Sequence, residues 1–446
     1  MNNKIKHIGI DARFYGPIGK GLGRYTQEIV DNIIKLDQAN HYVIFLRQEN
    51  YNDFVGTDKR IKKVLADIEW YGLKEQLIFP WLIWRERLDL MHFPHFNVPI
   101  FCPTKFIVTI HDLILIKFPT LRATTLGPWF YKIKKLAYKI VITMAVRRAK
   151  RIIAVSNFTK NDIIQQFKIK PAKIIVTYEG VKDLTLHPAF TPPMTGGARQ
   201  AGQATLLPES DDGVKNRKGE QNPLNPPLPK GQSQKQDEIL AKYNIKKPYL
   251  LYVGNAYPHK NLEGLIKIFQ QLIIQISGGS TSNLEVEPPP NPDIQLVLVG
   301  KEDYFYTRLK SYAKSLDLWQ ENVSSPVIFP GYISDDNLAV LYRKALLYVF
   351  PSFYEGFGLP SLEAMANGCP VVSSNQTSLP EILGQAAIYF DPNNEDEMLK
   401  QIQNLINNKN LRQELVSRGY EQIKKYSWLE CAKKTLEIYH QILRQN

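Results

Sequence analysis

The chain has 446 residues, which is long enough for two domains of ordinary size, because a single core rarely grows that large. Hydrophobic residues make up 44% and charged residues 22% of the sequence, as in soluble globular proteins. The net charge of +13 implies an acidic partner surface, either nucleic acid or anionic lipid.

The sequence shows no signal for secretion, for a membrane span or for a metal site. Residues 1–6 are polar and basic and lead directly into an apolar strand, so we expect no signal peptide and a cytoplasmic protein. The most apolar long window, 136–146, is shorter than the ~20 residues of a membrane-spanning helix. Three cysteines lie far apart, which fits a reducing compartment, and no Cys/His cluster has metal-binding spacing.

Residues 1–187 alternate short β-rich runs with helical stretches, which predicts a doubly wound α/β domain. Several of these runs are continuously apolar, as strands buried on both faces of a parallel sheet should be. We expect strands at His7–Asp11, Tyr42–Leu46, Leu90–Phe93, Phe106–Ile110, Arg151–Val155 and Lys173–Thr177.

The first expected strand is followed by a glycine-rich segment, Gly16–Tyr25, which we interpret as a loop. Such a loop suggests a dinucleotide site, but the G-x-G-x-x-G spacing is not met and no acidic ribose ligand is evident. The strand at Phe106–Ile110 leads into His111 and Asp112. A lone histidine there is more often structural than catalytic. Ser156 is placed to cap the next helix.

A strongly basic helix is expected at residues 128–151. The stretch 121–151 contains nine basic residues and no acidic one, and aromatic side chains begin the helix. Two interpretations remain open: a packed helix with a solvated basic face, and a helix on an anionic membrane surface. Nucleic acid is disfavoured because no nucleic-acid-binding module accompanies the stretch.

From 188 to 237 the composition shifts to Pro, Gly, Gln, Asn and charged residues. This segment cannot bury enough apolar surface to offset its ordering entropy, so we expect a disordered insertion without chemistry. A shorter one is expected at 277–292.

Residues 238–427 predict a second doubly wound domain, followed by a helix, within 428–446, that packs back on the first. Two such domains would face each other across a cleft, where ligands bind at the carboxyl ends of strands. The expected strands are Tyr249–Gly254, Ile294–Gly300, Val327–Gly331, Leu346–Pro351, Pro370–Ser373 and Ala387–Phe390.

A glycine turn and a short helix follow the strand at Leu346–Pro351, and a glutamate flanks the turn on each side, Glu355 before it and Glu363 after it. Gly356 and Gly358 allow a tight turn, and the free amides of the helix start form an anion site. A diphosphate with a sugar on each side fits between the two carboxylates. On spacing alone, a solvated glutamate pair is an equally good interpretation.

A second turn of this kind follows the strand at Tyr249–Gly254 and contains Lys260, whose charge would suit the β-phosphate of a leaving nucleoside diphosphate. The competing interpretation is a helix-entry loop with a solvated lysine.

The segment from Glu355 to Glu363 resembles the E-x7-E motif of the family 4 glycosyltransferases, and its flanks at 351–352, 364–372 and 375–381 match too. The resemblance implies the α/β GT-B fold, in which two doubly wound Rossmann-like domains face each other across a cleft. It also implies that Glu363 binds the donor ribose and Glu355 the hydroxyls of the donor sugar. Backbone groups that would bind sugar and diphosphate belong to Gly356, Phe357, Gly358 and Leu359.

The resemblance implies further donor contacts in the turn around Gly254. The family commonly has an arginine just after this glycine or just before the lysine, where this chain has Asn255 and His259. Lys260 is therefore the clearest cation, and His259 would assist only when protonated. Gly331 and Tyr332 lie where the family binds the nucleobase.

In the first domain, the resemblance implies that His111 touches the donor sugar near its reacting carbon, with Asp112 orienting it or capping the following segment. Gly19, Gly21 and Arg24 would belong to a loop that closes over the donor diphosphate and shapes the acceptor site.

The expected reaction is transfer of a hexosyl group from a nucleoside-diphosphate sugar with retention of the anomeric configuration, and mannose is the first choice of sugar. GDP-mannose is the first choice of donor, and UDP- or dTDP-sugars come next. The acceptor would be a glycan or polyprenyl-linked oligosaccharide of surface polysaccharide synthesis, which favours a peripheral position at the inner face of the membrane. No cofactor or metal is expected, because cationic side chains and the amides at helix starts would stabilise the charge of the diphosphate in place of a metal ion. A non-catalytic nucleotide-sugar-binding scaffold and a GT-B epimerase or phosphorylase remain alternatives.

Overall fold

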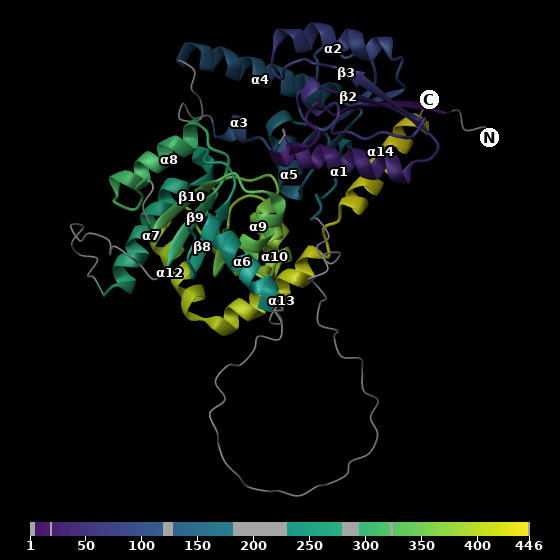
Figure 1. The fold of residues 1–446 in the computed structure, drawn as a ribbon. Coiled ribbons are helices and arrows are strands. Elements are labelled where there is room, and N and C mark those ends of the chain that lie inside the picture. The colour runs from purple at the N-terminus through teal and green to yellow at the C-terminus, as the bar shows by residue number, and fades with distance from the viewer. Residues whose placement is uncertain are drawn as a thin grey trace, which may run out of the picture.

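Two parallel β-sheets, one in each half of the chain, form the centres of two domains (Figure 1). The computed structural model describes residues 5–17, 20–118, 128–181, 230–278, 294–321 and 324–444. The N-terminal sheet has the order β3-β2-β1-β4-β5-β6-β7 and the C-terminal sheet the order β10-β9-β8-β11-β12-β13. Their strands are β1 (His7–Asp11), β2 (His41–Leu46), β3 (Ile61–Leu65), β4 (Leu90–Phe93), β5 (Phe106–Ile110), β6 (Arg151–Ala154), β7 (Ile174–Val176), β8 (Tyr249–Val253), β9 (Gln295–Val299), β10 (Val327–Gly331), β11 (Leu347–Phe350), β12 (Val371–Ser374) and β13 (Ala387–Phe390).

Both sheets are doubly wound, which confirms the predicted fold class. The strand order changes direction between β1 and β4 and again between β8 and β11, and ligands of such sheets bind at the carboxyl ends beside these switch points. The predicted strands are all present with small shifts at their ends. The sequence analysis missed β3, because this edge strand carries Lys62 and Lys63 in its centre and lacks a continuous apolar run.

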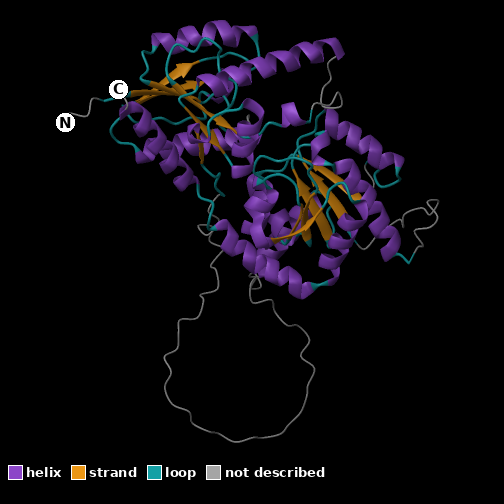
Figure 2. Cartoon of the chain, turned by 180° about the vertical axis from the view of Figure 1, so that it is seen from behind, coloured by secondary structure: helices purple, strands orange, loops and turns teal. Residues whose placement is uncertain are grey.

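Helices cover both faces of each sheet (Figure 2). They are α1 (Lys20–Leu36), α2 (Leu73–Arg85), α3 (Ile114–Lys117), α4 (Pro128–Arg148), α5 (Asn157–Phe167), α6 (Lys230–Lys242), α7 (Leu262–Ile276), α8 (Tyr304–Ser315), α9 (Asp335–Lys344), α10 (Leu359–Ala366), α11 (Leu379–Leu383), α12 (Glu395–Asn407), α13 (Lys409–Ile423) and α14 (Trp428–Arg444). In the C-terminal domain, α7 contacts α8 and α12, whereas α10 contacts α9 and α13 on the other side of the sheet.

In the N-terminal domain, α2, α4 and α5 share one apolar cluster with the sheet, and α1 and α14 share the cluster on the opposite face. The last helix, α14, runs alongside α1 (Figure 1). Its Tyr439 hydroxyl lies 2.6 Å from Nδ1 of the buried His92 on β4. The C-terminal end of the chain therefore completes the core of the N-terminal domain.

Three predicted boundaries are wrong. The segment Gly16–Tyr25 is not a continuous loop, because α1 begins at Lys20. Its glycines permit close packing: a Cβ at Gly23 would overlap the carbonyl oxygen of Gly16. Residues 230–237, assigned to the insertion, form the start of α6. The basic helix ends at Arg148, because the chain turns into β6.

Some predictions lie outside the described residues, namely those for Gly19 and for most of the two insertions, 188–229 and 279–292. Among the helices that the structure describes, none is long and apolar enough to cross a membrane.

Candidate active site

The turn after β11 places Glu355 and Glu363 on either side of the start of α10. Gly358 adopts a φ of 98°, a left-handed conformation that suits glycine, and α10 begins at the next residue with a proline in its first turn. The neighbouring segment fixes the turn, because the Glu355 backbone N–H donates to the Thr377 hydroxyl over 3.0 Å and the Ser378 hydroxyl donates to the Glu355 carbonyl over 3.1 Å.

The turn after β8 meets the turn after β11 through one ion pair. Nζ of Lys260, at the end of a single 3-10 turn (Pro258–Lys260), lies 2.6 Å from Oε1 of Glu355, and both side chains are largely buried. A buried ion pair of this kind is held in place because either partner alone would be an uncompensated charge. The two turns lie beside the switch point between β8 and β11.

His259 does not supply a second positive charge. The side chain is buried, and burial together with the neighbouring Lys260 lowers the pKa of His259 to about 3. The imidazole is therefore neutral near pH 7, and the expectation that a protonated His259 assists with phosphate is wrong. Its carbonyl accepts a 2.8 Å hydrogen bond from the Phe353 backbone N–H, which joins the two turns.

Arg24 reaches across from α1 to the C-terminal domain. Its guanidinium donates a short hydrogen bond to Glu363 and lies 2.5 Å from Oδ2 of Asp335, at the start of α9. Burial raises the pKa of Glu363, although the Arg24 charge acts in the opposite direction. Arg24 therefore lies on a helix rather than in the expected loop, but it still contacts a proposed donor ligand. Gly21 lies one turn earlier on α1.

His111, at the end of β5, is held by both ring nitrogens. Nδ1 lies 3.0 Å from a carboxylate oxygen of Glu179 and Nε2 lies 2.9 Å from the Pro94 carbonyl oxygen. Burial lowers the pKa of His111, but the hydrogen bond and charge of Glu179 outweigh it, so the net pKa is raised. Because both partners accept, a ring that carries a proton on each nitrogen fits this environment best.

The backbone of His111 faces the turn after β11 at close range. A Cβ at Gly356 would overlap the carbonyl oxygen of His111, so only glycine fits. The Gly356 carbonyl accepts a 2.7 Å hydrogen bond from the Ser156 hydroxyl. Ser156 also caps α5 as predicted, accepting from the Thr159 backbone N–H over 3.1 Å. The structure thus brings His111 and the glutamate turn together.

The remaining predicted residues lie at the same ends of the strands. Asp112 accepts a 2.9 Å hydrogen bond from the backbone N–H of Ile114, the first residue of α3. Gly254 follows β8, and its carbonyl accepts from the Tyr306 hydroxyl over 2.9 Å. Gly331 ends β10 with a φ of 75°, and the next side chain, Tyr332, is exposed.

The sequence analysis missed Glu179 and the role of Glu381. Glu179 follows β7 and precedes a glycine, a position at the carboxyl end of a strand that could have been recognised. Glu381, on α11, accepts hydrogen bonds from the Asn157 and Phe158 backbone N–H groups over 2.7 and 2.9 Å, and from the Tyr178 hydroxyl over 3.0 Å. These donors belong to the other domain.

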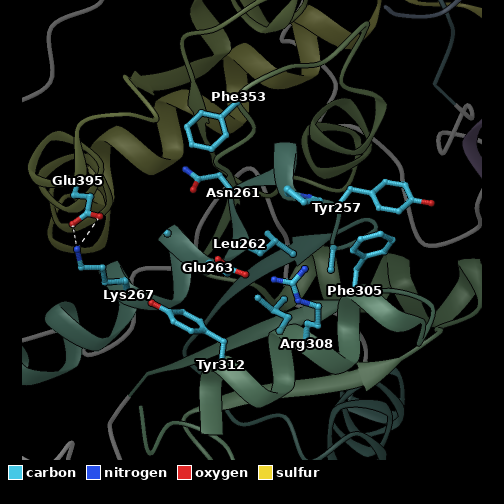
Figure 3. Close-up of a pocket in the computed structure, with 14 residues that line it drawn as sticks. Tyr257, Asn261, Leu262, Glu263, Lys267, Phe305, Arg308, Tyr312, Phe353 and Glu395 are labelled. Atoms are coloured by element: carbon cyan, nitrogen blue, oxygen red, sulfur yellow. Dashed lines mark hydrogen bonds and ion pairs between the residues drawn. The ribbon is translucent and has the colours of Figure 1, made fainter. Parts of the chain in front are cut away.

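A separate pocket of about 330 Å³ lies between α7, α8 and the turn after β8 (Figure 3). Its lining includes Tyr257, Asn261, Phe305 and Arg308, but neither glutamate of the turn after β11. In the part of the chain that the structure describes, no cluster of three or more His, Cys, Asp or Glu side chains is placed to bind a metal ion.

The chain is similar to known proteins along most of its length. Residues 20–183 match the family described as Glycosyltransferase Family 4, and residues 235–422 match the family described as Glycosyl transferases group 1. The chain is 26% identical over 438 residues to O-antigen chain mannosyltransferase B of Escherichia coli, a match that covers 94% of this chain and 95% of that protein.

Among solved structures, sucrose-phosphate synthase from Thermosynechococcus elongatus has a TM-score of 0.67 at 17% identity, over 99% of this chain and 100% of that one. The Anabaena protein Alr3699/HepE in complex with UDP and glucose has a TM-score of 0.63 at 16% identity, over 98% of this chain and 99% of that one. At these identities the likeness shows the fold alone. Taken with the two family matches, it places the chain among the family 4 glycosyltransferases of GT-B fold.

Proposed function

We propose that the protein is a retaining mannosyltransferase that moves the sugar of a nucleoside-diphosphate donor to a hydroxyl group of a growing surface glycan. The observation that carries the proposal is the Lys260–Glu355 ion pair beside the glycine turn, with Glu363 one helical turn further on. The likeness to a protein named O-antigen chain mannosyltransferase B supports mannose and a polysaccharide acceptor. The same likeness disfavours the two alternatives, a non-catalytic nucleotide-sugar-binding scaffold and a GT-B epimerase or phosphorylase.

In the proposed site, three side chains each bind a different part of the donor. Glu363 would accept hydrogen bonds from the ribose, in exchange for part of its contact with Arg24. Glu355 would accept from hydroxyls of the transferred sugar. Lys260 would then move its charge from Glu355 toward the β-phosphate, where the amides at the start of α10 add to it.

In this proposal the acceptor oxygen attacks on the face that the diphosphate leaves, and the departing phosphate takes up the acceptor proton. His111 would lie against the transferred sugar, since its backbone touches the glutamate turn. Lys260 and the amides would stabilise the charge of the leaving group, so we expect no need for a divalent metal. Transfer in the presence of EDTA should match transfer in added Mg²⁺, and a loss with EDTA would count against this arrangement.

A donor screen tests the proposal directly. GDP-mannose should raise the midpoint of thermal unfolding more than UDP- or dTDP-sugars, and NMR of the product should show the anomeric configuration of the donor. The Glu355→Ala variant should lose transfer, because Lys260 and the donor hydroxyls lose their shared partner. Undiminished transfer in Glu355→Ala would refute the site assignment.

We also propose that the protein attaches peripherally to an anionic membrane surface through α4. Lys132, Lys134, Lys135 and Lys139 are all exposed, and α4 contains no acidic residue. Such a helix can lie on anionic lipid. Co-sedimentation with anionic liposomes should weaken when Lys132, Lys134 and Lys135 are changed to Glu, and no change would count against this attachment.

A further inference from the structure

The pocket between α7, α8 and the turn after β8 has aromatic walls. Its lining includes the rings of Tyr257, Phe305, Tyr312 and Phe353, all of which are partly exposed. Tyr257 and Phe305 pack edge to face at one end of the pocket, with ring centroids 4.7 Å apart and 81° between the ring planes (Figure 3). Exposed aromatic rings around a concave site offer apolar surface that a ligand ring can cover.

The charged side chains that line the pocket are of both signs in equal number. Lys267 and Arg308 are basic, and Glu263 and Glu395 are acidic. Nζ of Lys267 lies 2.7 Å from Oε2 of Glu395, at the end of the pocket opposite the Tyr257 ring (Figure 3). This balance favours a neutral ligand over a phosphate or an amine. Carboxylates accept hydrogen bonds and Arg and Lys donate them, so a hydroxyl group can find a partner in either role.

The start of α7 forms another wall of the pocket. Asn261 adopts a φ of 56°, a left-handed conformation that is uncommon for residues other than glycine, and its side-chain amide donates to the Pro392 carbonyl over 3.2 Å. A Cβ at Gly264 would lie 2.4 Å from Oδ1 of Asn261, so glycine leaves room for the asparagine side chain. Because the surrounding structure holds Asn261 in this conformation, the wall has a defined shape.

The pocket and the candidate active site share two turns. In the turn after β8, Tyr257 lines the pocket, and Lys260 pairs with Glu355. In the turn after β11, Phe353 lines the pocket, and Glu355 follows two residues later. The two sites are therefore neighbours on either side of these turns, and a chain-like ligand with its end in the active site could continue into the pocket.

Phe353 also connects the pocket to the N-terminal domain. Its ring is nearly parallel to that of Phe118, which follows α3, with ring centroids 6.4 Å apart and 16° between the planes. The pocket therefore lies beside the boundary between the two domains, a place where ligands bind preferentially.

A saccharide meets these requirements together. One face of a hexose ring consists of C–H groups that can pack on aromatic rings, and its edge carries hydroxyl groups that both donate and accept hydrogen bonds. A phosphate would meet two carboxylates, and a purely apolar ligand would remove charged side chains from water without offering them hydrogen bonds. The volume of about 330 Å³ is at the lower end of the range for ligand pockets, which suits a short part of a glycan.

We infer that this pocket binds a sugar unit of the growing glycan, behind the end that receives the new sugar. The inference rests on the proposed function, because the proposed reaction supplies the glycan. A second contact along one chain makes binding of its end an intramolecular event, so a long acceptor stays bound more firmly than a short one.

The test uses the full chain without donor, and NMR titration with mannotriose as the probe. Phe305→Ala should bind mannotriose roughly threefold to tenfold more weakly than the wild type, because one aromatic face is lost. Arg308→Ala should also weaken binding, and it leaves the aromatic packing in place. Tyr304→Ala is the matched control, because Tyr304 is the preceding aromatic residue of α8 and is 50% exposed but does not line the pocket. It should bind mannotriose like the wild type.

Three outcomes would overturn the inference: wild-type affinity for mannotriose in both Phe305→Ala and Arg308→Ala, an equal loss in Tyr304→Ala, or displacement of mannotriose by GDP, which would place the sugar in the donor site. Failure of the proposed function is a separate result, seen as no stabilisation of the wild type by any nucleotide sugar. Retained stabilisation by the donor in Phe305→Ala and Arg308→Ala would show that their fold and donor site are intact.

Discussion

Glu381 and Asn157 join the two domains through a helix cap that crosses between them. The carboxylate on α11 accepts the backbone N–H of Asn157 over 2.7 Å, at the first residue of α5, and its second oxygen accepts that of Phe158. A negative charge at a helix N-terminus is favourable because it satisfies free N–H groups and opposes the positive end of the helix dipole. Helix α5 also carries the contact to the Gly356 carbonyl through Thr159, so the cap fixes the approach of the domains.

We therefore predict that Glu381→Gln slows transfer without weakening donor binding. The amide has one acceptor in place of two and no charge, so the start of α5 is held less firmly and the two halves of the site align less often. We expect kcat to fall roughly tenfold to a hundredfold, the range for a small misplacement of reacting groups. Steady-state kinetics and donor titration by calorimetry measure the two effects separately.

The control for this variant is Glu414→Gln, which removes an exposed ion pair with Arg418 on α13. It should leave kcat unchanged, because such pairs contribute little. A Glu381→Gln enzyme with normal kcat would mean that the cap does not position the domains.

A second prediction concerns Gly356, whose backbone packs directly against the backbone of His111 in the other domain. Alanine at this position forces the turn away from the His111 carbonyl oxygen, so Gly356→Ala should lose most of its activity while both domains stay folded. Gly72→Ala is the matched control, since its Cβ would meet only one oxygen, at 3.8 Å. Transfer assays and circular dichroism on both variants test this, and full activity in Gly356→Ala would contradict the tight approach.

The strands and turns that depend on residues close together in the chain could be predicted from the sequence. Buried parallel strands such as β8 and β11 are continuous apolar runs, and the turn after β11 can be recognised in the sequence from its glycines and proline. The edge strand β3 was missed because Lys62 and Lys63 break the apolar run. The start of α1 was missed because its glycines favour a loop locally, whereas Gly23 is required by close packing against the carbonyl oxygen of Gly16.

The contacts of the candidate site that cross large sequence separations could not be predicted in the same way. No local pattern pairs Arg24 with Glu363, and none pairs His111 with Glu179, because these pairs arise only when elements far apart in the sequence meet in the fold. The positions of His111, Lys260 and the two glutamates at strand ends were predictable, since parallel sheets bring such ends to one edge. Their roles toward a donor stay predictions.

The His111–Glu179 pair should make stability depend on pH. The folded pKa of His111 is raised above its unfolded value of about 6.5, so the pair stabilises the fold fully below that pH and progressively less as pH rises through the folded pKa. We expect Glu179→Gln to cost about 1.5–3 kcal/mol near pH 5.5, the typical contribution of a hydrogen bond to a charged group, and much less at pH 9. Urea unfolding of the wild type and the Glu179→Gln variant at both pH values measures this. A loss of unfolding free energy that is independent of pH would contradict the charged pair.

Lys260 should be the main source of positive charge for the donor diphosphate, because His259 is neutral and the described turn around it offers no arginine. Lys260→Met should weaken binding of a nucleoside diphosphate by about tenfold to a hundredfold, which corresponds to one charge-assisted hydrogen bond. The effect should disappear for the nucleoside, which has no phosphate. Lys267→Met, on α7, removes a lysine that pairs with Glu395 at the surface and serves as the control. Calorimetric titration of the three proteins with diphosphate and nucleoside separates a phosphate contact from general damage, because equal losses for both ligands would place Lys260 outside the phosphate site.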